Sequence, residues 1–127
     1  MIDIMIVDDS SIIRKIFAKN LEEMGFRVTG VAKDGREALS MYDKLKPDLV
    51  TMDVTMPIMN GLESLKALRS KDSDAKVIMV TSHGEERLVM EAITSGAKGY
   101  ILKPITKENI EQAILKVFPK LLKEETF

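Results

Sequence analysis

The stretch Asp48–Gly61, DLVTMDVTMPIMNG, joins a short apolar run to a turn and to the start of an amphipathic segment. Its first half is continuously apolar, as is typical of a strand that is buried on both faces of a parallel sheet. The run ends on a carboxylate, Asp53, and turn-forming residues follow as far as Asn60. A turn alone explains an acid at this position, so the meaning of Asp53 depends on what the fold brings beside it.

The same pattern recurs along the chain, in which short apolar runs alternate with amphipathic segments. The runs that we expect to be strands are Ile2–Val7, Arg27–Ala32, Asp48–Asp53, Lys76–Thr81 and Gly99–Leu102. The segments between them carry apolar residues at three- and four-residue steps, as helices do. Asp34 with Glu37, and Asn60 with Glu63, have the spacing of a capping box at a helix start. Strand and helix units in alternation predict an α/β fold, a doubly wound parallel sheet of five strands with five helices.

The composition is that of one soluble domain. The 127 residues are 45% hydrophobic and 31% charged, and 19 basic side chains nearly balance 20 acidic ones, which argues against a nucleic-acid partner. The absence of cysteine excludes disulfides, thiolate zinc sites and thiol catalysis. No signal peptide or membrane span is recognisable, so we expect a cytoplasmic protein with no membrane partner. We expect residues 1–118 to form the domain and 119–127 a tail that extends the last helix if Pro119 only kinks it.

Polar residues end four of the five apolar runs: Asp8-Asp9, Asp53, Thr81 and Lys103. Each has an ordinary explanation, such as a helix cap, a turn acid or a solvated strand end. In an open parallel sheet, however, ligands bind outside the carboxyl ends of the strands, where these residues should meet. Together they indicate one shared site.

The chemistry that such a set supports is narrow. Neighbouring carboxylates repel one another unless a cation lies among them, and an all-oxygen set suits Mg²⁺. A lysine and a hydroxyl opposite the cation stabilise a transferring phosphoryl group. Since a carboxylate can act as the nucleophile, Asp53 is the candidate acceptor that would form an acyl phosphate.

The motifs VDDS, MDVTMPIMNG, MVTSHG and SGAKGYILKPIT, in this order, resemble the receiver domain of two-component response regulators. The resemblance covers Ile2 to about Phe118, and PDLVTMDVTMP is most similar to free-standing chemotaxis regulators of the CheY type. It implies a flavodoxin-like, CheY-like sheet with strand order 2-1-3-4-5, the order known for that fold. It also implies a signalling switch that catalyses only its own phosphorylation and dephosphorylation, and not an enzyme that turns over other substrates.

The resemblance assigns roles to matching positions. Asp53 is the phosphoacceptor, Asp9 binds Mg²⁺ directly, Asp8 holds it through water, and the backbone carbonyl of Thr55 completes the protein ligands. Lys103 pairs with the phosphoryl oxygens.

Three further positions match the family. Thr81 and Tyr100 correspond to its switching pair, and Pro104 to a proline that follows a cis peptide bond. The implied phosphodonor is a histidine kinase of the CheA type. The implied output face joins Glu85–Ser95, Tyr100 and Thr106–Val117, with the flagellar motor switch as the expected target and a phosphatase as a further partner.

Other functions stay open at this point. The chain could be a phosphorelay carrier, or the receiver domain of a larger response regulator. A haloacid-dehalogenase-like phosphatase uses similar groups, but its nucleophile follows the first strand and its second acid lies two residues later. A flavodoxin-like flavin carrier needs a Ser/Thr/Gly-rich phosphate loop where this chain has VDDSSI.

Overall fold

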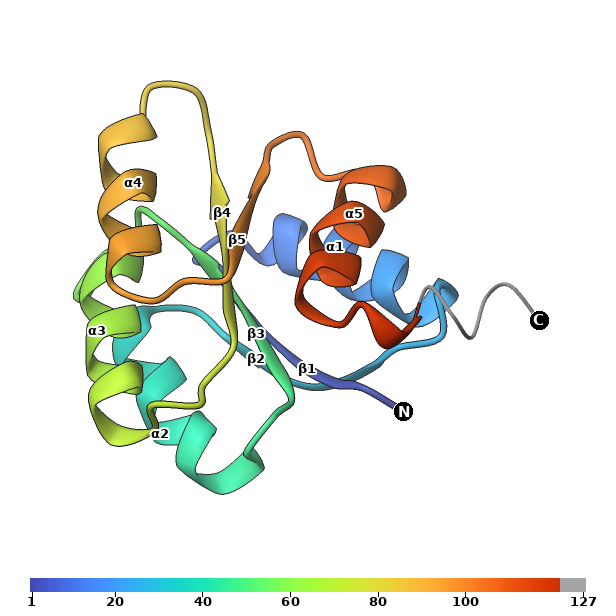
Figure 1. Ribbon diagram of the computed structural model, residues 1–127, viewed down its shortest axis with the longest axis horizontal. Coiled ribbons are helices and arrows are strands. Elements are labelled where there is room, and N and C mark those ends of the chain that lie inside the picture. The colour runs from blue at the N-terminus through green and yellow to red at the C-terminus, as the bar shows by residue number, and fades with distance from the viewer. Residues whose placement is uncertain (122–127) are drawn as a thin grey trace.

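The computed structural model describes residues 1–121, which form a central parallel sheet between two layers of helices (Figure 1). The strands are β1 (Asp3–Val7), β2 (Arg27–Ala32), β3 (Leu49–Asp53), β4 (Val77–Thr81) and β5 (Gly99–Leu102). The helices are α1 (Ser11–Glu23), α2 (Gly35–Leu45), α3 (Gly61–Lys71), α4 (Glu86–Thr94) and α5 (Lys107–Val117). The strand order is β2-β1-β3-β4-β5, which confirms the predicted class and topology.

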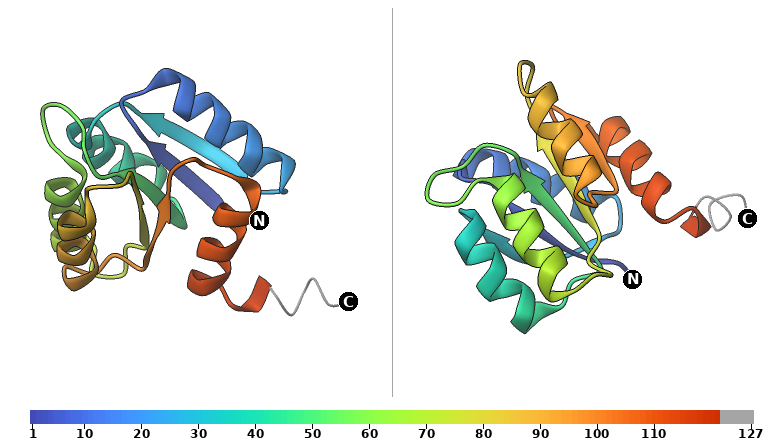
Figure 2. Two further views of the ribbon diagram at one scale, coloured as in Figure 1. Left: turned by 90° about the horizontal axis from the view of Figure 1, so that it is seen from above. Right: turned by 60° about the vertical axis from the view of Figure 1, so that its left-hand side comes forward.

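Each face of the sheet has its own apolar core. Helices α2, α3 and α4 cover one face, and α1 and α5 cover the other, as Figures 1 and 2 show. Every residue of β3 and of β4 is buried, because these central strands lie between both layers. Side chains alternate along a strand, so Met52 and Met79 join the first core while Ile78 and Val80 join the second.

Most helices begin at a side-chain cap. Ser10, Asp34, Asn60 and Thr106 each accept a hydrogen bond from a backbone N–H in the first turn of α1, α2, α3 and α5, respectively. The capping box of Asn60 and Glu63 is complete, which confirms that prediction. The predicted box at Asp34 is only half formed, because the Glu37 carboxylate accepts from the N–H of Lys33 instead. Helix α4 alone among the five has no side-chain cap.

The last helix ends at Val117, and Phe118 leaves helical geometry just before Pro119. Leu121 nevertheless packs against the core beneath α1 and α5. The rest of the predicted tail, residues 122–127, lies outside the described residues. Within residues 1–121, no helix combines the length and the hydropathy that a membrane span requires.

The topology brings the ends of the strands together. All pairs are parallel, so every strand finishes at the same edge of the sheet. Val7 is opposite Met52, and Asp53 is opposite Val80, so the residues just after β1 lie beside the end of β3. The chain leaves β1 for β2 on one side, and β3 lies on the other side. This is the switch point at which open α/β sheets bind ligands.

Candidate functional site

Asp53 ends β3 with its side chain almost entirely buried, at 7% exposure. Two backbone hydrogen bonds fix the loop that follows Asp53. The N–H of Val54 donates to the carbonyl of Val80, and the N–H of Gly61 donates to the carbonyl of Val54. Gly61 must be glycine, because a Cβ there would lie 2.1 Å from the carbonyl oxygen of Asp53. The acceptor loop is therefore folded tightly back onto the strand that carries the carboxylate.

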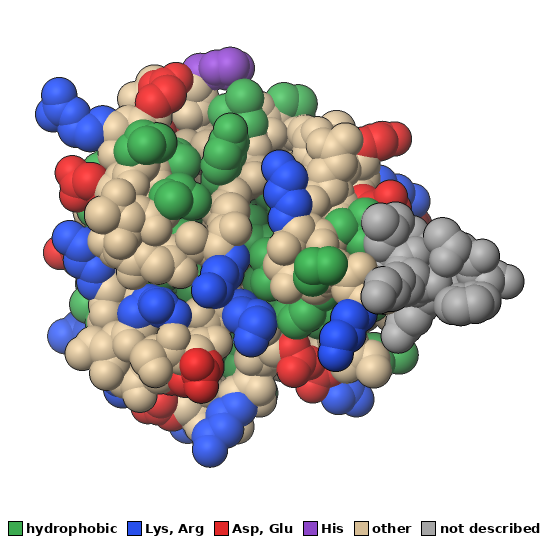
Figure 3. All heavy atoms as spheres, in the orientation of Figure 1, with side chains coloured by type: hydrophobic (Ala, Val, Ile, Leu, Met, Phe, Trp, Pro, Cys, Tyr) green, Lys and Arg blue, Asp and Glu red, His purple; other side chains and the backbone are tan. Residues whose placement is uncertain are grey.

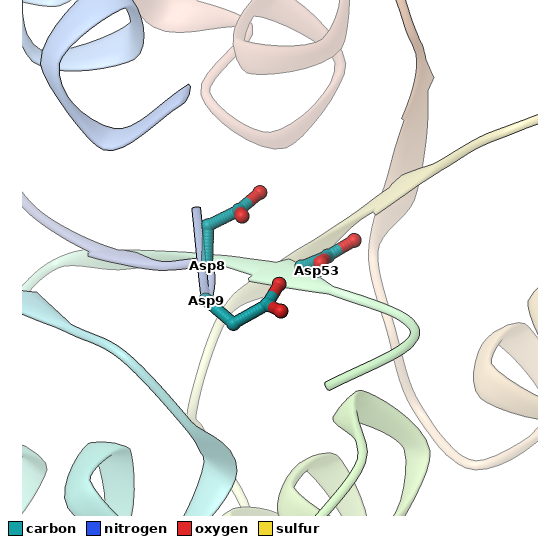
Figure 4. A group of neighbouring side chains, drawn as sticks. All are labelled: Asp8, Asp9 and Asp53. Atoms are coloured by element: carbon teal, nitrogen blue, oxygen red, sulfur yellow. The ribbon is translucent and has the colours of Figure 1, made fainter. Parts of the chain in front are cut away.

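Asp8 and Asp9, which follow β1, approach the same point (Figure 4). One carboxylate oxygen from each of these residues and one from Asp53 lie within 4.8 Å of one another. Asp8 is 3% exposed and accepts the N–H of Ser10 at 2.9 Å, whereas Asp9 faces solvent. Ser10, and neither acid, caps α1, so both aspartates are free of that structural task.

Lys103, directly after β5, supplies the positive charge. Its Nζ lies 3.6 Å from Oδ2 of Asp8 and 3.5 Å from Oδ1 of Asp53. The peptide bond between Lys103 and Pro104 is cis. The lysine thus spans two carboxylates without a close hydrogen bond to either.

The pKa of Asp53 is raised to about 7, chiefly by burial and next by the negative charge of Asp8, with smaller contributions from Asp9 and Glu85, while Lys103 partly offsets the rise. One lysine therefore does not offset the desolvated negative charge of this cluster. The carboxylate of Asp53 is costly to ionise, and a cation among the acids would lower that cost.

The donor set fits Mg²⁺. The ligand atoms are carboxylate oxygens, which this ion prefers, and two oxygens bound to one Mg²⁺ at ~2.1 Å lie no more than ~4.2 Å apart. The three carboxylate oxygens lie within 4.8 Å of one another, so they gather around one point that a small cation could occupy. Asp8, Asp9 and Asp53 are the residues that would hold the ion.

Thr81 ends β4 and is 3% exposed. Its hydroxyl donates to Oε1 of Glu85 at 2.9 Å. Tyr100 of β5 lies nearby with 57% of its surface exposed. A hollow of about 220 Å³ lies between them, and it is lined by Thr81, Ser82, His83, Glu86, Val89, Met90, Tyr100 and Leu102. Exposed hydrophobic side chains gather over α4 and β5 beside it, in the upper part of Figure 3.

The sequence pattern gave Glu85 no role beyond the output face, yet its carboxylate lies at the centre of the site's hydrogen bonds. It accepts from the Thr81 hydroxyl, from the N–H of Ser82 at 2.6 Å, and from the hydroxyl of Thr55. The family resemblance assigned the backbone carbonyl of Thr55 to the metal and predicted no hydrogen-bond partner for its hydroxyl. An acid four residues after Thr81, in a loop that must return over the strand ends, was the signal available in the sequence.

Comparison with known proteins agrees with this geometry. The profile of the response regulator receiver domain matches residues 4–115. The chain belongs to the response regulator receiver family. It is 41% identical to the chemotaxis protein CheY of Thermotoga maritima over 114 residues, covering 90% of this chain and 95% of the relative.

Two solved receiver structures show the same fold. The CheX–CheY–BeF₃–Mg complex of Borrelia burgdorferi matches with a TM-score of 0.88 and 35% identity, over 92% of this chain and 89% of that one. A LuxR-family two-component response regulator of Aurantimonas sp. SI85-9A1 matches with a TM-score of 0.87 and 31% identity, over 94% and 86% of the two chains. Receiver domains are switches of two-component signalling that take a phosphoryl group from histidine kinases and bind Mg²⁺, and they are not classical enzymes.

Proposed function

We propose that this receiver domain is a phosphorylation-dependent switch in which Asp53 accepts the phosphoryl group of a phosphohistidine on a histidine kinase. The observation that supports this most strongly is the position of the Asp53 carboxylate, which is buried at the end of β3 between two further acids and Lys103. Asp8 and Asp9 are close enough to share a cation with Asp53, and Lys103 is close enough to bind an oxygen of an incoming group.

In the proposed transfer, an oxygen of Asp53 attacks phosphorus as the P–N bond to the donor imidazole breaks. The electron pair of that bond stays on the imidazole nitrogen, which takes up a proton from water. Lys103 pairs with one phosphoryl oxygen, and the Thr81 hydroxyl donates to another. Asp8, Asp9, Asp53 and the carbonyl of Thr55 would hold Mg²⁺, which would supply charge neutralisation when bound.

The switch that we propose links Thr81 to Tyr100. When the Thr81 hydroxyl turns toward the phosphoryl group, Tyr100 moves from solvent into the hollow between α4 and β5, burying its ring. The lining of that hollow supports this, because Val89, Met90 and Leu102 offer apolar contacts to an aromatic ring. The output face is then α4, β5 and α5.

Chemotaxis is the cellular role that we favour, because the 41% identical relative is a chemotaxis protein and nearly all of its length is covered. A CheA-type kinase, the flagellar motor switch and a phosphatase are the partners that this role implies. The match to a LuxR-family regulator keeps a phosphorelay carrier or a receiver within a larger regulator as the second candidate. A pull-down of motor switch protein that depends on phosphorylation separates these roles.

The experiment that tests the proposal follows phosphoryl incorporation by intact-mass spectrometry, with phosphoramidate as the donor and Mg²⁺ present. We expect the wild type to gain one phosphoryl group and Asp53→Asn to gain none. Asp43→Asn is the matched control, since Asp43 is an exposed acid paired with Lys71 far from the site. Steady release of inorganic phosphate from p-nitrophenyl phosphate, without a phosphorylated protein, would instead support the phosphatase alternative.

A further inference from the structure

The β4–α4 loop carries an acid whose side chain turns away from its own helix. Glu85 immediately precedes α4 but does not cap it. Its carboxylate instead reaches back over the end of β4, where Oε1 accepts both the Thr81 hydroxyl and the N–H of Ser82, at 2.9 and 2.6 Å. Oε2 accepts the hydroxyl of Thr55, which lies in the β3–α3 loop. Three donors, one at the end of β4 and one in each of the loops after β3 and β4, therefore converge on one side chain.

This carboxylate is an anion at neutral pH. Burial alone would raise the pKa of Glu85, but the hydrogen bonds from Thr55, Ser82 and Thr81, with Lys103 nearby, hold it below its ordinary value. The charge of Glu85 in turn adds to the groups that raise the pKa of Asp53. The two carboxylates are thus close enough to repel each other across the site.

In the proposed function, a phosphoryl group on Asp53 takes the Thr81 hydroxyl, and the Ser82 amide follows it directly in the chain. The Thr81 hydroxyl has one proton and the Ser82 amide has one, so each can serve Glu85 or a phosphoryl oxygen but cannot fully serve both. The phosphoryl group would also bring more negative charge to a place where the Glu85 carboxylate already lies. The Thr81 hydroxyl can therefore donate its hydrogen bond to Glu85 or to the phosphoryl group, but not to both at once.

We infer that Glu85 is an internal competitor of the phosphoryl group: it holds the Thr81 and Ser82 donors in the unphosphorylated protein and is expelled when Asp53 is phosphorylated. The inference rests on the proposed function, in which Asp53 is the acceptor. Gly84, at a φ of +95°, precedes Glu85 and gives the loop a backbone conformation that other residues rarely adopt. The backbone carbonyl of Glu85 accepts the N–H of Val89, so the residue that holds these donors also takes part in the first turn of α4.

The test compares Glu85→Ala and Glu85→Gln with the wild type, with Glu86→Gln as the matched control. Glu86 is the adjacent acid in sequence, and it hydrogen-bonds the N–H of Gly84 and none of the three donors. Two quantities are measured in the presence of Mg²⁺: the second-order rate constant for phosphorylation by phosphoramidate, and the Kd of beryllofluoride, a tetrahedral phosphoryl mimic.

We expect Glu85→Ala to raise the rate constant and to tighten beryllofluoride binding by about tenfold, the change that corresponds to losing one charge-assisted hydrogen bond. Glu85→Gln keeps the shape but loses the charge, so its effect should have the same direction and be smaller. Glu86→Gln should stay within about twofold of the wild type.

The inference about Glu85 is wrong if both Glu85 variants fold and are phosphorylated no faster than the wild type. If the wild type is phosphorylated normally in that experiment, the acceptor role of Asp53 is unaffected. An equal gain in Glu86→Gln also overturns it, because the effect would then be one of net charge. A wild type that takes up neither phosphoryl group nor beryllofluoride overturns both proposals.

Discussion

The sheet carries pairs of opposite charge at both of its ends, the amino edge where the strands begin and the carboxyl edge where they finish. The pairs differ in how closely the charges approach and in how deeply they are buried. At the amino edge, Arg27 of β2 makes two short contacts to Asp3 of β1, at 2.7 and 2.9 Å, and Asp48 accepts the N–H of Asp3 at 2.8 Å. The hydrogen bond from Arg27 holds the pKa of Asp3 below its ordinary value. At the carboxyl edge, Lys103 stays 3.5 Å or more from its carboxylates, and burial raises the pKa of Asp53 to about 7.

The difference teaches that burial and geometry, more than the number of charges, separate a structural pair from a reactive site. The Arg27 and Asp3 side chains are 61% and 24% exposed, so solvent helps to satisfy them. The side chains of Asp8 and Asp53 are 4% and 7% exposed, so their charges must be satisfied mainly by protein groups and bound ions. The fold therefore maintains an electrostatically unfavourable cluster at one edge, as functional sites commonly do.

The largest effect is expected from Lys103→Met. Removing the cation that faces the phosphoryl oxygens should slow phosphorylation by phosphoramidate by ~100-fold or more, as the loss of one charge-stabilising donor does in other transfer reactions. Lys107→Met is the control, since Lys107 forms an exposed pair with Glu23 on the outside of α5. Comparable rates for the two variants would show that Lys103 has no special part in the transfer.

The next largest effect is expected from the binding of Mg²⁺, which should stabilise the fold. Relief of carboxylate repulsion exists only in the folded state, so Mg²⁺ at about 100 times its Kd should raise the free energy of unfolding by about 2.7 kcal/mol. Chemical denaturation with and without Mg²⁺ measures this. Asp9→Asn should lose most of the gain, and Asp48→Asn at the amino edge should keep it. A full Mg²⁺ response in Asp9→Asn would place the ion elsewhere.

The acids at the two edges should show opposite dependences of stability on pH. Because the folded pKa of Asp53 is raised, the folded state binds more protons than the unfolded state between about pH 4 and 7, and stability is lost as pH rises through that window. Without Mg²⁺, Asp53→Asn should therefore raise the free energy of unfolding by about 1–2 kcal/mol at pH 8, and the gain should vanish toward pH 4.

Asp3→Asn is the counterpart at the amino edge. The folded pKa of Asp3 is lowered, so its contribution is present at neutral pH and is lost as pH falls through that pKa. We expect a small loss of stability at pH 8. Denaturation curves of both variants between pH 4 and 8 measure these changes. If the free energy of unfolding at pH 8 changes in the same direction in Asp53→Asn and Asp3→Asn, the contrast between the two edges is refuted.

The smallest effect is expected from the proposed switch, in which the Tyr100 ring moves from solvent into the hollow beside α4. The chain has two tyrosines, and Tyr42 is buried with its hydroxyl donated to Asp72 at 2.7 Å. With 3-fluorotyrosine incorporated, beryllofluoride should shift the Tyr100 fluorine resonance as the ring becomes buried, while Tyr42 serves as an internal reference. An unmoved Tyr100 resonance at saturating beryllofluoride would exclude the switch.

Much of this fold was predictable because the local signals agree with one another. Three signals point to one parallel sheet: the apolar run that ends at Asp53, the capping box of Asn60 and Glu63, and the polar residues after the strands. Parallel strands bring their carboxyl ends together, so the order of residues along the chain is enough to place Asp8, Asp53 and Lys103 in one site.

The role of Glu85 was not predictable in the same way. Its contacts depend on a side-chain rotamer and on the path of a loop, and neither has a periodic signal in sequence. The incomplete box at Asp34 also depends on a rotamer, since the Glu37 carboxylate accepts from the N–H of Lys33 and not from that of Asp34. The sequence pattern places a side chain on an element, but it does not select which of several neighbouring groups the side chain will bond.

The most direct test of the acceptor role is to locate the phosphoryl group. Borohydride reduces an acyl phosphate of aspartate to homoserine, which peptide mass spectrometry can assign to one position. After brief phosphorylation with Mg²⁺, we predict homoserine at position 53 and at no other aspartate. Homoserine at position 8 or 9, or a phosphoryl group that resists borohydride, would contradict the claim that the fold prepares Asp53 as the acceptor.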